Sequence, residues 1–165
     1  MTPAFVIREP TPADVPELVR VHVETWRASY SELLPAGFFT EEVTAGRTRM
    51  WTSLTGSPRA DRQVRVAERD GTVIGFALAG LPEDPAAPRP LQLYAIYLDP
   101  DQHGSGAGQA LLDAVLGGSP AVLWVAERNP RARAFYERNG FRLDGERHVD
   151  SATPDLVEVR MVRGA

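Results

Sequence analysis

The sequence predicts an α/β domain, in which helices flank a mixed, mostly antiparallel sheet of about seven strands. Three stretches carry this prediction: a hairpin pattern over residues 63–79, a junction of strand, glycine loop and helix over residues 91–111, and an apolar run over residues 121–125. Strand and helix patterns follow one another along the chain without an internal repeat or a low-complexity tract. One domain over residues 1–165 is therefore expected.

A short strand at residues 5–8 precedes the first helix. Thr11 can cap this helix, Pro12 suits its first position, and Asp14 favours its positive end. A second helix is predicted over residues 41–54. The first helix has an apolar stripe at the spacing of a core-facing side, formed by Val15, Leu18, Val19, His22 and Trp26.

The hairpin has the clearest turn signal in the chain. Asp70-Gly71 supplies the positive backbone angles of a two-residue turn, so strands are predicted at residues 63–69 and 72–79. The proline-rich residues 81–90 form a surface loop, because the sheet pattern resumes directly after them.

Residues 91–98 form the central strand, which Asp99-Pro100 ends before a helix over residues 106–116. The first amides of a helix lack intrahelical partners and carry the positive end of its dipole. Between strand and helix, three positions have no side chain to keep an anion away from those amides: Gly104, Gly106 and Gly108. The loop is a candidate phosphate cradle, and a plain tight turn is the alternative.

Two nucleotide-binding motifs do not fit this loop. A Walker A motif needs a lysine, and the chain contains none. A dinucleotide-binding fingerprint that starts at Gly104 needs Gly or Ala at position 109, where Gln109 stands. An unrelated nucleotide-binding domain is thus a third and weaker interpretation.

The remaining elements complete the sheet. Residues 121–125 form a strand parallel to the central one, because a helix connects the two. Asn129 caps a helix that closes at Asn139-Gly140, and two more strands follow, one from Phe141 and one over residues 156–161.

Two blocks of sequence resemble the GNAT N-acetyltransferase superfamily. The segment His103-Gly-Ser-Gly-Ala-Gly108 is similar to the family's acetyl-CoA loop, [QR]-x-x-G-x-[GA], with His103 in place of Gln or Arg. The segment Asn129-Pro-Arg-Ala-Arg-Ala-Phe-Tyr-Glu-Arg-Asn-Gly-Phe141 is similar to N-x-x-A-x-x-F-Y-x-x-x-G-F. The two blocks stand in the family's order and at its separation.

The resemblance implies an acyl-CoA N-acyltransferase-like fold, acetyl-CoA as co-substrate and no metal ion. The fourth and fifth strands then splay apart, and an amide-bearing ligand can satisfy the backbone groups that lose their partners. The cofactor-binding residues that it implies are Ile96, Tyr97, Leu98, His103, Gly104, Ser105, Gly106, Ala107, Gly108, Asn129 and Tyr136.

The implied reaction is direct transfer of an acetyl group to a primary amine in a ternary complex. The chain has no cysteine and no G-x-S-x-G elbow, so a covalent enzyme intermediate is not expected. Tyr136 matches the family tyrosine that protonates the departing thiolate, and its ordinary pKa of about 10 suits a general acid. The alternative for Tyr136 is a packing role. We expect Phe135 in the core and Tyr136 toward the cofactor, because adjacent helical residues do not share a face.

The sequence leaves the base that deprotonates the amine open. Glu24, Glu127 and Glu158 are candidates, and Gln92 and Tyr94 lie on the central strand where relatives place a carboxylate or a water-holding side chain.

Other N-terminal residues have two interpretations each. His22 is either a catalytic base or, as we expect, a buried histidine with a backbone partner. Trp26, Tyr30 and Phe38 either line the amine pocket or pack in the core.

Composition limits the partners. The net charge of −4 argues against nucleic acid, which clustered positive charge would bind. Without an apolar segment long enough for a membrane or a cysteine for a disulfide, a soluble cytoplasmic protein is expected. The partner is then a small-molecule or peptide amine, and a homodimer is among the oligomeric states considered. The competing class is a non-catalytic acyl-CoA-binding or regulatory module on the same fold.

Overall fold

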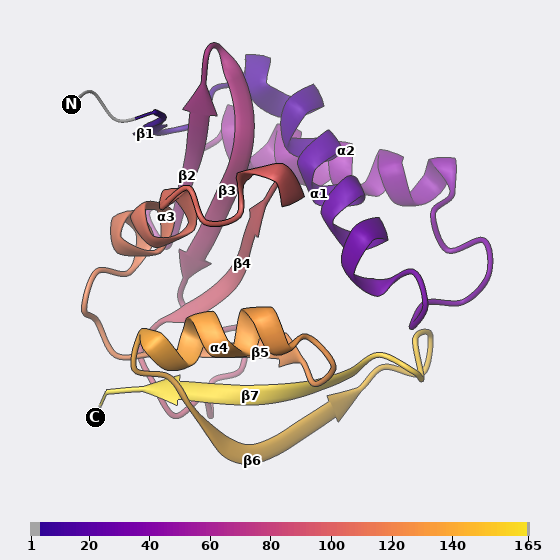
Figure 1. The fold of residues 1–165 in the computed structure, drawn as a ribbon, viewed down its shortest axis with the longest axis vertical. Helices are drawn as coiled ribbons and strands as arrows, with labels where there is room; N and C mark the ends of the chain where they lie inside the picture. Colours follow the sequence, from indigo (N-terminus) through magenta and orange to yellow (C-terminus); the bar gives the residue numbers. More distant parts are fainter. Residues whose placement is uncertain (1–3, 165) are drawn as a thin grey trace.

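The computed structural model describes residues 4–164 and shows the predicted mixed sheet (Figure 1). The strands are β1 (Val6–Arg8), β2 (Arg62–Arg69), β3 (Thr72–Gly80), β4 (Gln92–Leu98), β5 (Ala121–Ala126), β6 (Arg142–Val149) and β7 (Val157–Arg163). They form one seven-stranded sheet in the order β1-β2-β3-β4-β5-β7-β6. The helices are α1 (Val15–Tyr30), α2 (Glu41–Gly56), α3 (Ala107–Val115) and α4 (Pro130–Arg138), and short 3-10 turns occupy Pro12–Asp14 and Pro100–Gln102.

Strands β4 and β5 are parallel, as predicted, and the other neighbouring pairs among the described residues are antiparallel. The predicted hairpin joins β2 to β3, with φ of +52° at Asp70 and +80° at Gly71. The first helix starts later than predicted, because Pro12–Asp14 form a 3-10 turn before α1 begins at Val15.

Helices α1 and α2 pack on one face of the sheet. Trp51 of α2 and Leu18 of α1 are fully buried against Phe76 of β3. The interplanar angle between Trp51 and Phe76 is 75°, with ring centroids 4.6 Å apart, an edge-to-face arrangement that aromatic pairs prefer.

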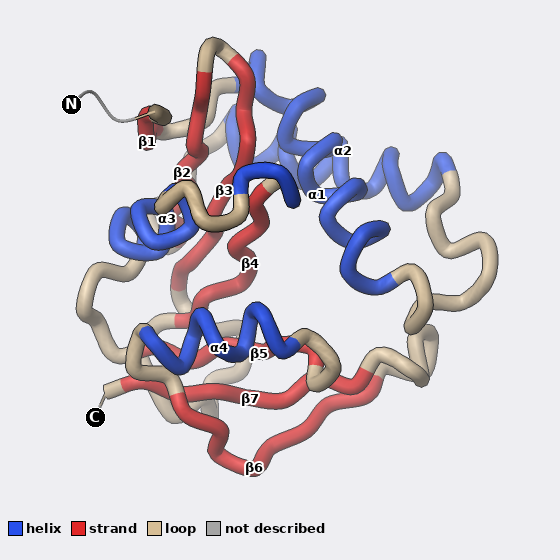
Figure 2. The backbone as a smooth tube through the Cα atoms, in the orientation of Figure 1, coloured by secondary structure: helices blue, strands red, loops and turns tan. Residues whose placement is uncertain are grey.

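Helices α3 and α4 lie on the opposite face and bury the larger cluster (Figure 2). Leu111 and Leu112 of α3 contribute to it beside β3 and β4, and Tyr136 and Phe141 contribute beside β5 and β7. The helices thus form two groups on either side of a central sheet. None of the helices within residues 4–164 combines the length and the apolar character needed to cross a membrane.

The sheet opens between β4 and β5. Their register is limited to Gln92 with Val122 and Leu93 with Leu123, although both strands continue for several residues. Strand β4 also has a bulge: Leu78 pairs with Ala95 and Ala79 pairs with Leu93, so Tyr94 is an extra residue without a β3 partner. The predicted splay of these two strands is present in Figures 1 and 2, where β4 and β5 diverge.

A buried carboxylate ties β1 to the start of α1. Asp14 accepts hydrogen bonds from the guanidinium of Arg8 at 2.8 and 2.9 Å and from the backbone amide of Thr11 at 2.7 Å. Its side chain is 11% exposed. These hydrogen bonds, that from Arg8 above all, lower the pKa of Asp14, although burial opposes the shift.

We expect Asp14→Asn to lower the free energy of unfolding by about 1–3 kcal/mol at neutral pH. Because the folded state depresses the pKa of Asp14, its contribution is complete above the ordinary carboxyl pKa of about 4 and is lost as the pH falls through the folded value. Urea unfolding should therefore show a difference in the free energy of unfolding between variant and wild type, and this difference should become smaller in acid. Asp61→Asn, at an aspartate whose side chain is 31% exposed and pairs with Arg59, is the control, with a much smaller change expected. A difference that is independent of pH would contradict this account.

Candidate active site

A cavity of about 600 Å³ occupies the opening between β4 and β5. Its walls come from both faces of the sheet. Leu98, Phe135 and Tyr136 belong to the α3 and α4 side, whereas Trp26 and Tyr97 belong to the α1 and α2 side. The cavity therefore connects the two faces where the strands separate.

The glycine loop forms one end of this cavity. Gly104 has φ +82° and Gly106 has φ +89°, a left-handed conformation that favours glycine. A Cβ built at either position would meet nothing within 4 Å. The space above the loop is therefore open, as an anion site requires.

Three loop amides have no partner within residues 4–164, namely those of Gly104, Gly106 and Gly108. Other amides are engaged, because Ser105 donates to the carbonyl of Gln102 at 3.2 Å and Ala107 donates to the hydroxyl of Ser105 at 3.3 Å. Of the predicted cofactor-binding residues, Ser105 and Ala107 do not line the cavity, whereas the others do. The free amides alternate with bonded ones at the start of α3 and are available to an anion.

Positive charge gathers at the same end. Arg131 and Arg138 of α4 line the cavity with His103. Partial burial and the charge of Arg131 lower the pKa of His103, while the Leu98 carbonyl and Asp101 oppose the shift. Sequence reasoning missed the two arginines, although their separation of two helical turns places them on one side of α4. This end of the cavity suits a polyanion.

The open edge of β4 forms the middle of the cavity. The amide of Asp99 donates to the Ile74 carbonyl of β3 at 2.8 Å. The backbone N–H and C=O groups of successive residues point to opposite sides of a strand. Those of Tyr97 therefore also point to β3, and those of Ile96 and Leu98 point to β5. No β5 residue pairs with Ile96 or Leu98 among the described residues, which leaves their polar groups available to a ligand.

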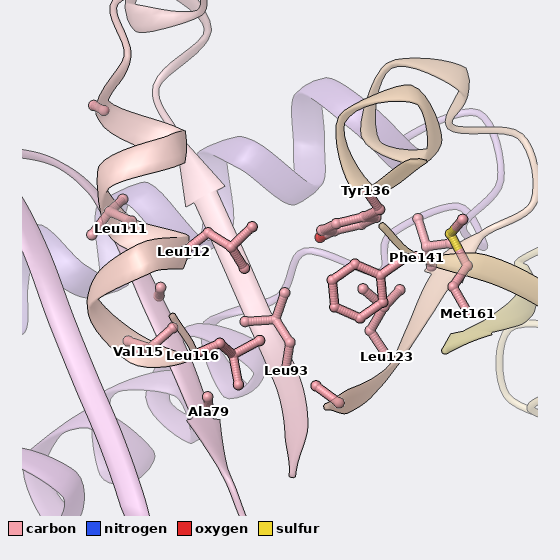
Figure 3. Packing of buried hydrophobic residues seen from close by; sticks show 14 of the residues in the cluster. Ala79, Leu93, Leu111, Leu112, Val115, Leu116, Leu123, Tyr136, Phe141 and Met161 are labelled. Atoms are coloured by element: carbon pink, nitrogen blue, oxygen red, sulfur yellow. The ribbon is translucent and has the colours of Figure 1, made fainter. Parts of the chain in front are cut away.

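Tyr136 stands beside this edge. Figure 3 shows its ring extending from α4 past Phe141 toward β4. The side chain is 8% exposed, and its hydroxyl makes no hydrogen bond within residues 4–164 but lines the cavity. Burial raises the pKa of Tyr136, and the neighbouring phenols Tyr97 and Tyr30 raise it further. The phenol is therefore protonated at neutral pH and faces the space where a ligand would lie.

The sequence predicts that Phe135 lies in the core and that Tyr136 faces the cofactor. The prediction is wrong for Phe135, which is the less buried of the two. Phe135 is only half-buried, whereas Tyr136 is buried, and both line the cavity. Phe135 packs against the core cluster from outside and lies beside the glycine loop, 4.0 Å from the position of a Cβ on Gly108. Asn129 caps α4 as predicted and accepts from the amide of Ala132 at 3.2 Å.

The structure separates the candidate bases. Glu24 is paired with Arg20 at 3.1 Å, and Glu127 is paired with Arg147 at 3.1 Å in a separate, smaller pocket. Neither Glu24 nor Glu127 lines the main cavity, whereas Glu158 does.

Two further candidates lie on β4. Gln92 is outside the cavity. Tyr94 lines it, but the hydroxyl of Tyr94 donates to the carbonyl of Leu81. Glu158 is therefore the candidate base that the structure favours.

His22 is a buried histidine, as expected, but its partner is a side chain and not a backbone group. Trp51 Nε1 donates to His22 Nδ1 at 3.2 Å. Burial, with a smaller effect of Arg47, lowers the pKa of His22 to about 3. His22 does not line the cavity, so the interpretation as a catalytic base is not supported.

Aromatic side chains form the α1 end of the cavity. Trp26 and Tyr30 line it, whereas Phe38 stacks behind Trp26 with ring centroids 6.1 Å apart. Sequence reasoning missed Trp124 and Leu156, which complete this wall. The alternation of β5 could have indicated Trp124, because it points away from the face that buries its neighbours.

Comparison with known proteins gives the family. The profile of the acetyltransferase (GNAT) domain matches residues 60–143. The chain is 30% identical over 145 residues to a probable N-acetyltransferase of Mycobacterium tuberculosis, covering 84% of this chain and 80% of the relative. It is 33% identical over 160 residues to an uncharacterized N-acetyltransferase of Bacillus subtilis, covering 93% and 89%.

The fold is similar to the crystal structure of the PaiA N-acetyltransferase from Thermoplasma acidophilum in complex with coenzyme A. The TM-score is 0.66 with 23% identity, and the match covers 100% of both chains. The sequence blocks, the splayed sheet and these relatives agree: the chain is an acetyltransferase and belongs to the GNAT family.

Proposed function

We propose that residues 1–165 act as a single domain that transfers an acetyl group from acetyl-CoA to a primary amine, with both substrates bound at once. The observation that carries the proposal is the cavity through the sheet, which has a loop with free backbone amides at one end and the Tyr136 hydroxyl beside its open middle. The similar structure crystallised with coenzyme A supports the choice of co-substrate.

Coenzyme A fits the residues present. Its diphosphate would lie on the free amides of Gly104, Gly106 and Gly108, in the open space that a Cβ on Gly104 or Gly106 would enter. Arg131 and Arg138 add positive charge there. The free backbone groups of Ile96 and Leu98 would bind the amides of the pantetheine arm, and a β4 amide would stabilise the charge that develops on the thioester oxygen.

Tyr136 then acts as the general acid. Its protonated hydroxyl faces the cavity and has no protein partner within residues 4–164, so it is free to donate a proton to the departing thiolate. The chain has no cysteine that could form an acyl-enzyme. Every group in this scheme comes from one chain, so it does not need the homodimer considered from the sequence.

The non-catalytic module is the less favoured alternative, because the relatives are named as N-acetyltransferases and a carboxylate faces the acceptor end of the cavity. Zero cysteines agree with the proposed location in a reducing cytoplasm.

Calorimetry with acetyl-CoA, followed by a thiol-release assay over a panel of amines, tests the proposal. We expect saturable binding and release of free coenzyme A that depends on the amine. Absence of binding at millimolar acetyl-CoA, or tighter binding of ATP than of coenzyme A, would contradict the proposed co-substrate. Binding without thiol release across the panel would favour the non-catalytic module.

A further inference from the structure

Charge is divided between the two ends of the cavity. The arginines that line it, Arg131 and Arg138, both lie on α4 at the end with the glycine loop. Among the described residues Glu158 is the one carboxylate in its wall, and it lies on β7 at the aromatic end. An electrostatic field along the cavity therefore favours an anion at the loop and a cation beside Glu158.

Glu158 has no ion pair and no hydrogen bond from its side chain within residues 4–164, although it is partly buried. Burial raises its pKa and Asp150 adds to the shift, while His148 opposes it. Tyr30, Tyr97 and Glu158 line the same cavity. Burial above all raises the pKa values of the two phenols, and the charge of Glu158 adds to both shifts. A partly desolvated carboxylate without a partner is suited to accept a proton.

The register of the sheet places Glu158 level with the open edge of β4. Leu93 pairs with Leu123, and because Tyr94 is an extra residue in β4, Ile96 is about level with Val125, one residue before Ala126, across the opening. Ala126 pairs with Glu158. Two strand spacings of about 4.8 Å separate Ile96 from Glu158, plus the width of the splay. Glu158 and Ile96 line the same cavity, so an amine bound by Glu158 would lie between that carboxylate and an acyl group on β4.

The walls beside Glu158 are aromatic and held in place. Trp26 Nε1 donates to the hydroxyl of Tyr97 at 2.9 Å, and Tyr30 packs edge-on against Trp26 with centroids 5.2 Å apart. Trp124 of β5 and Leu156 complete the wall. Aromatic faces attract an ammonium group and also bury an apolar ring.

No free cation lines this end to receive a carboxylate from the acceptor, as far as residues 4–164 are concerned. Arg160 is bound to Asp144 at 2.7 Å. Arg47 stacks 5.0 Å from the Trp26 ring and is not part of the cavity wall. An acceptor that carried a carboxylate beside its amine would leave that charge unpaired.

We infer that Glu158 binds the ammonium group of the acceptor and removes its proton, and that the acceptor is a primary amine on an apolar, ring-bearing body without a carboxylate. This inference rests on the proposed acetyl transfer. Glu158 takes one proton from the ammonium, and the nitrogen lone pair attacks the thioester carbon. The C–S bond breaks as Tyr136 protonates the thiolate, and Tyr136 regains a proton from the nitrogen. The proton on Glu158 leaves to solvent, so each turnover gives an amide, a free thiol and one proton.

Steady-state kinetics with phenethylamine as the probe test the role of Glu158. We expect Glu158→Gln to lower kcat/KM for this amine by about 10²- to 10⁴-fold, to remove the rise of the rate with pH, and to leave acetyl-CoA affinity unchanged. Glu158→Asp should recover part of the rate. Glu127→Gln, at the carboxylate paired with Arg147 in the smaller pocket, is the matched control and should behave as wild type.

The β,β-difluoro analogue of phenethylamine separates a base from a positioning residue. Its fluorines make the nitrogen a much weaker base, so it is already neutral and needs no deprotonation before attack. Glu158→Gln should therefore slow this amine far less than it slows phenethylamine. Equal losses with both amines, or no loss with either, would overturn the assignment of Glu158 as the base.

Paired acceptors test the substrate class. Phenethylamine should exceed phenylalanine, which adds a carboxylate, by at least about 100-fold in kcat/KM, and should exceed methylamine, which lacks the ring, by about 10- to 100-fold. Equal rates within either pair would overturn the proposed class. If the wild-type protein and Glu158→Gln turn over phenethylamine at the same rate, this inference alone is overturned. If the wild-type protein does not bind acetyl-CoA, the proposed function is overturned as well.

Discussion

Replacement of Tyr136 by Phe should lower kcat by about 10²- to 10⁴-fold, because the thiolate loses its proton donor. The affinity for acetyl-CoA should stay the same, since the ring and its packing against Phe135 and Phe141 remain. The hydroxyl makes no hydrogen bond within residues 4–164, so its removal leaves no protein group unpaired and thermal unfolding should be unaffected.

Tyr94→Phe is the matched control, because Tyr94 also lines the cavity but donates its hydroxyl proton to the carbonyl of Leu81. Its kcat should equal that of wild type. The raised pKa of Tyr136 adds a second expectation: the wild-type rate should not fall on the alkaline side up to the ordinary tyrosine pKa of about 10. A wild-type kcat in Tyr136→Phe, or an equal loss in Tyr94→Phe, would assign the proton transfer to another group.

Replacement of Gly106 by Ala should weaken acetyl-CoA binding by about 100-fold or more. The Cβ would project into the open space above the loop and displace the diphosphate from the free amides, where each hydrogen bond to a charged group contributes about 1.5–3 kcal/mol. Calorimetry measures the change directly.

Gly71→Ala provides a control for backbone strain. Gly71 has φ +80° against +89° at Gly106, and a Cβ at either position meets nothing within 4 Å. Both substitutions should lower the free energy of unfolding by about 1–2 kcal/mol, because alanine is strained in the left-handed region. Coenzyme affinity should fall in Gly106→Ala alone. Equal binding losses would mean that strain, and not occupation of the loop, explains the effect.

The order of the elements and the glycine loop could be predicted because local rules determine them. Asp70-Gly71 requires a turn, and alternating and helical patterns place the strands and helices around it. The cap at Asn129 follows from the same kind of rule and is confirmed. The site residues that these rules place, such as Gly106 and Tyr136, are brought to one cavity by the fold.

What could not be predicted depends on contacts between distant segments. The choice of Glu158 over Glu24 and Glu127 rests on which carboxylates find an arginine in three dimensions. The relative burial of Phe135 and Tyr136 depends on how α4 lies against the glycine loop. A helical stripe showed that His22 would be buried but could not identify Trp51 as its partner.

The extra residue at Tyr94 determines which backbone groups of β4 face the opening where the substrates would bind. Before the bulge, the carbonyl of Leu91 accepts from Val122 of β5, so odd-numbered residues present their polar backbone to β5. After it, Asp99 donates to β3, so the parity is reversed and even-numbered residues face the opening. Deletion of one residue there would exchange the two sides of the strand. The backbone groups of Tyr97, in place of those of Ile96 and Leu98, would then face an incoming thioester. An insertion of one amino acid thus decides the alignment of substrate and enzyme.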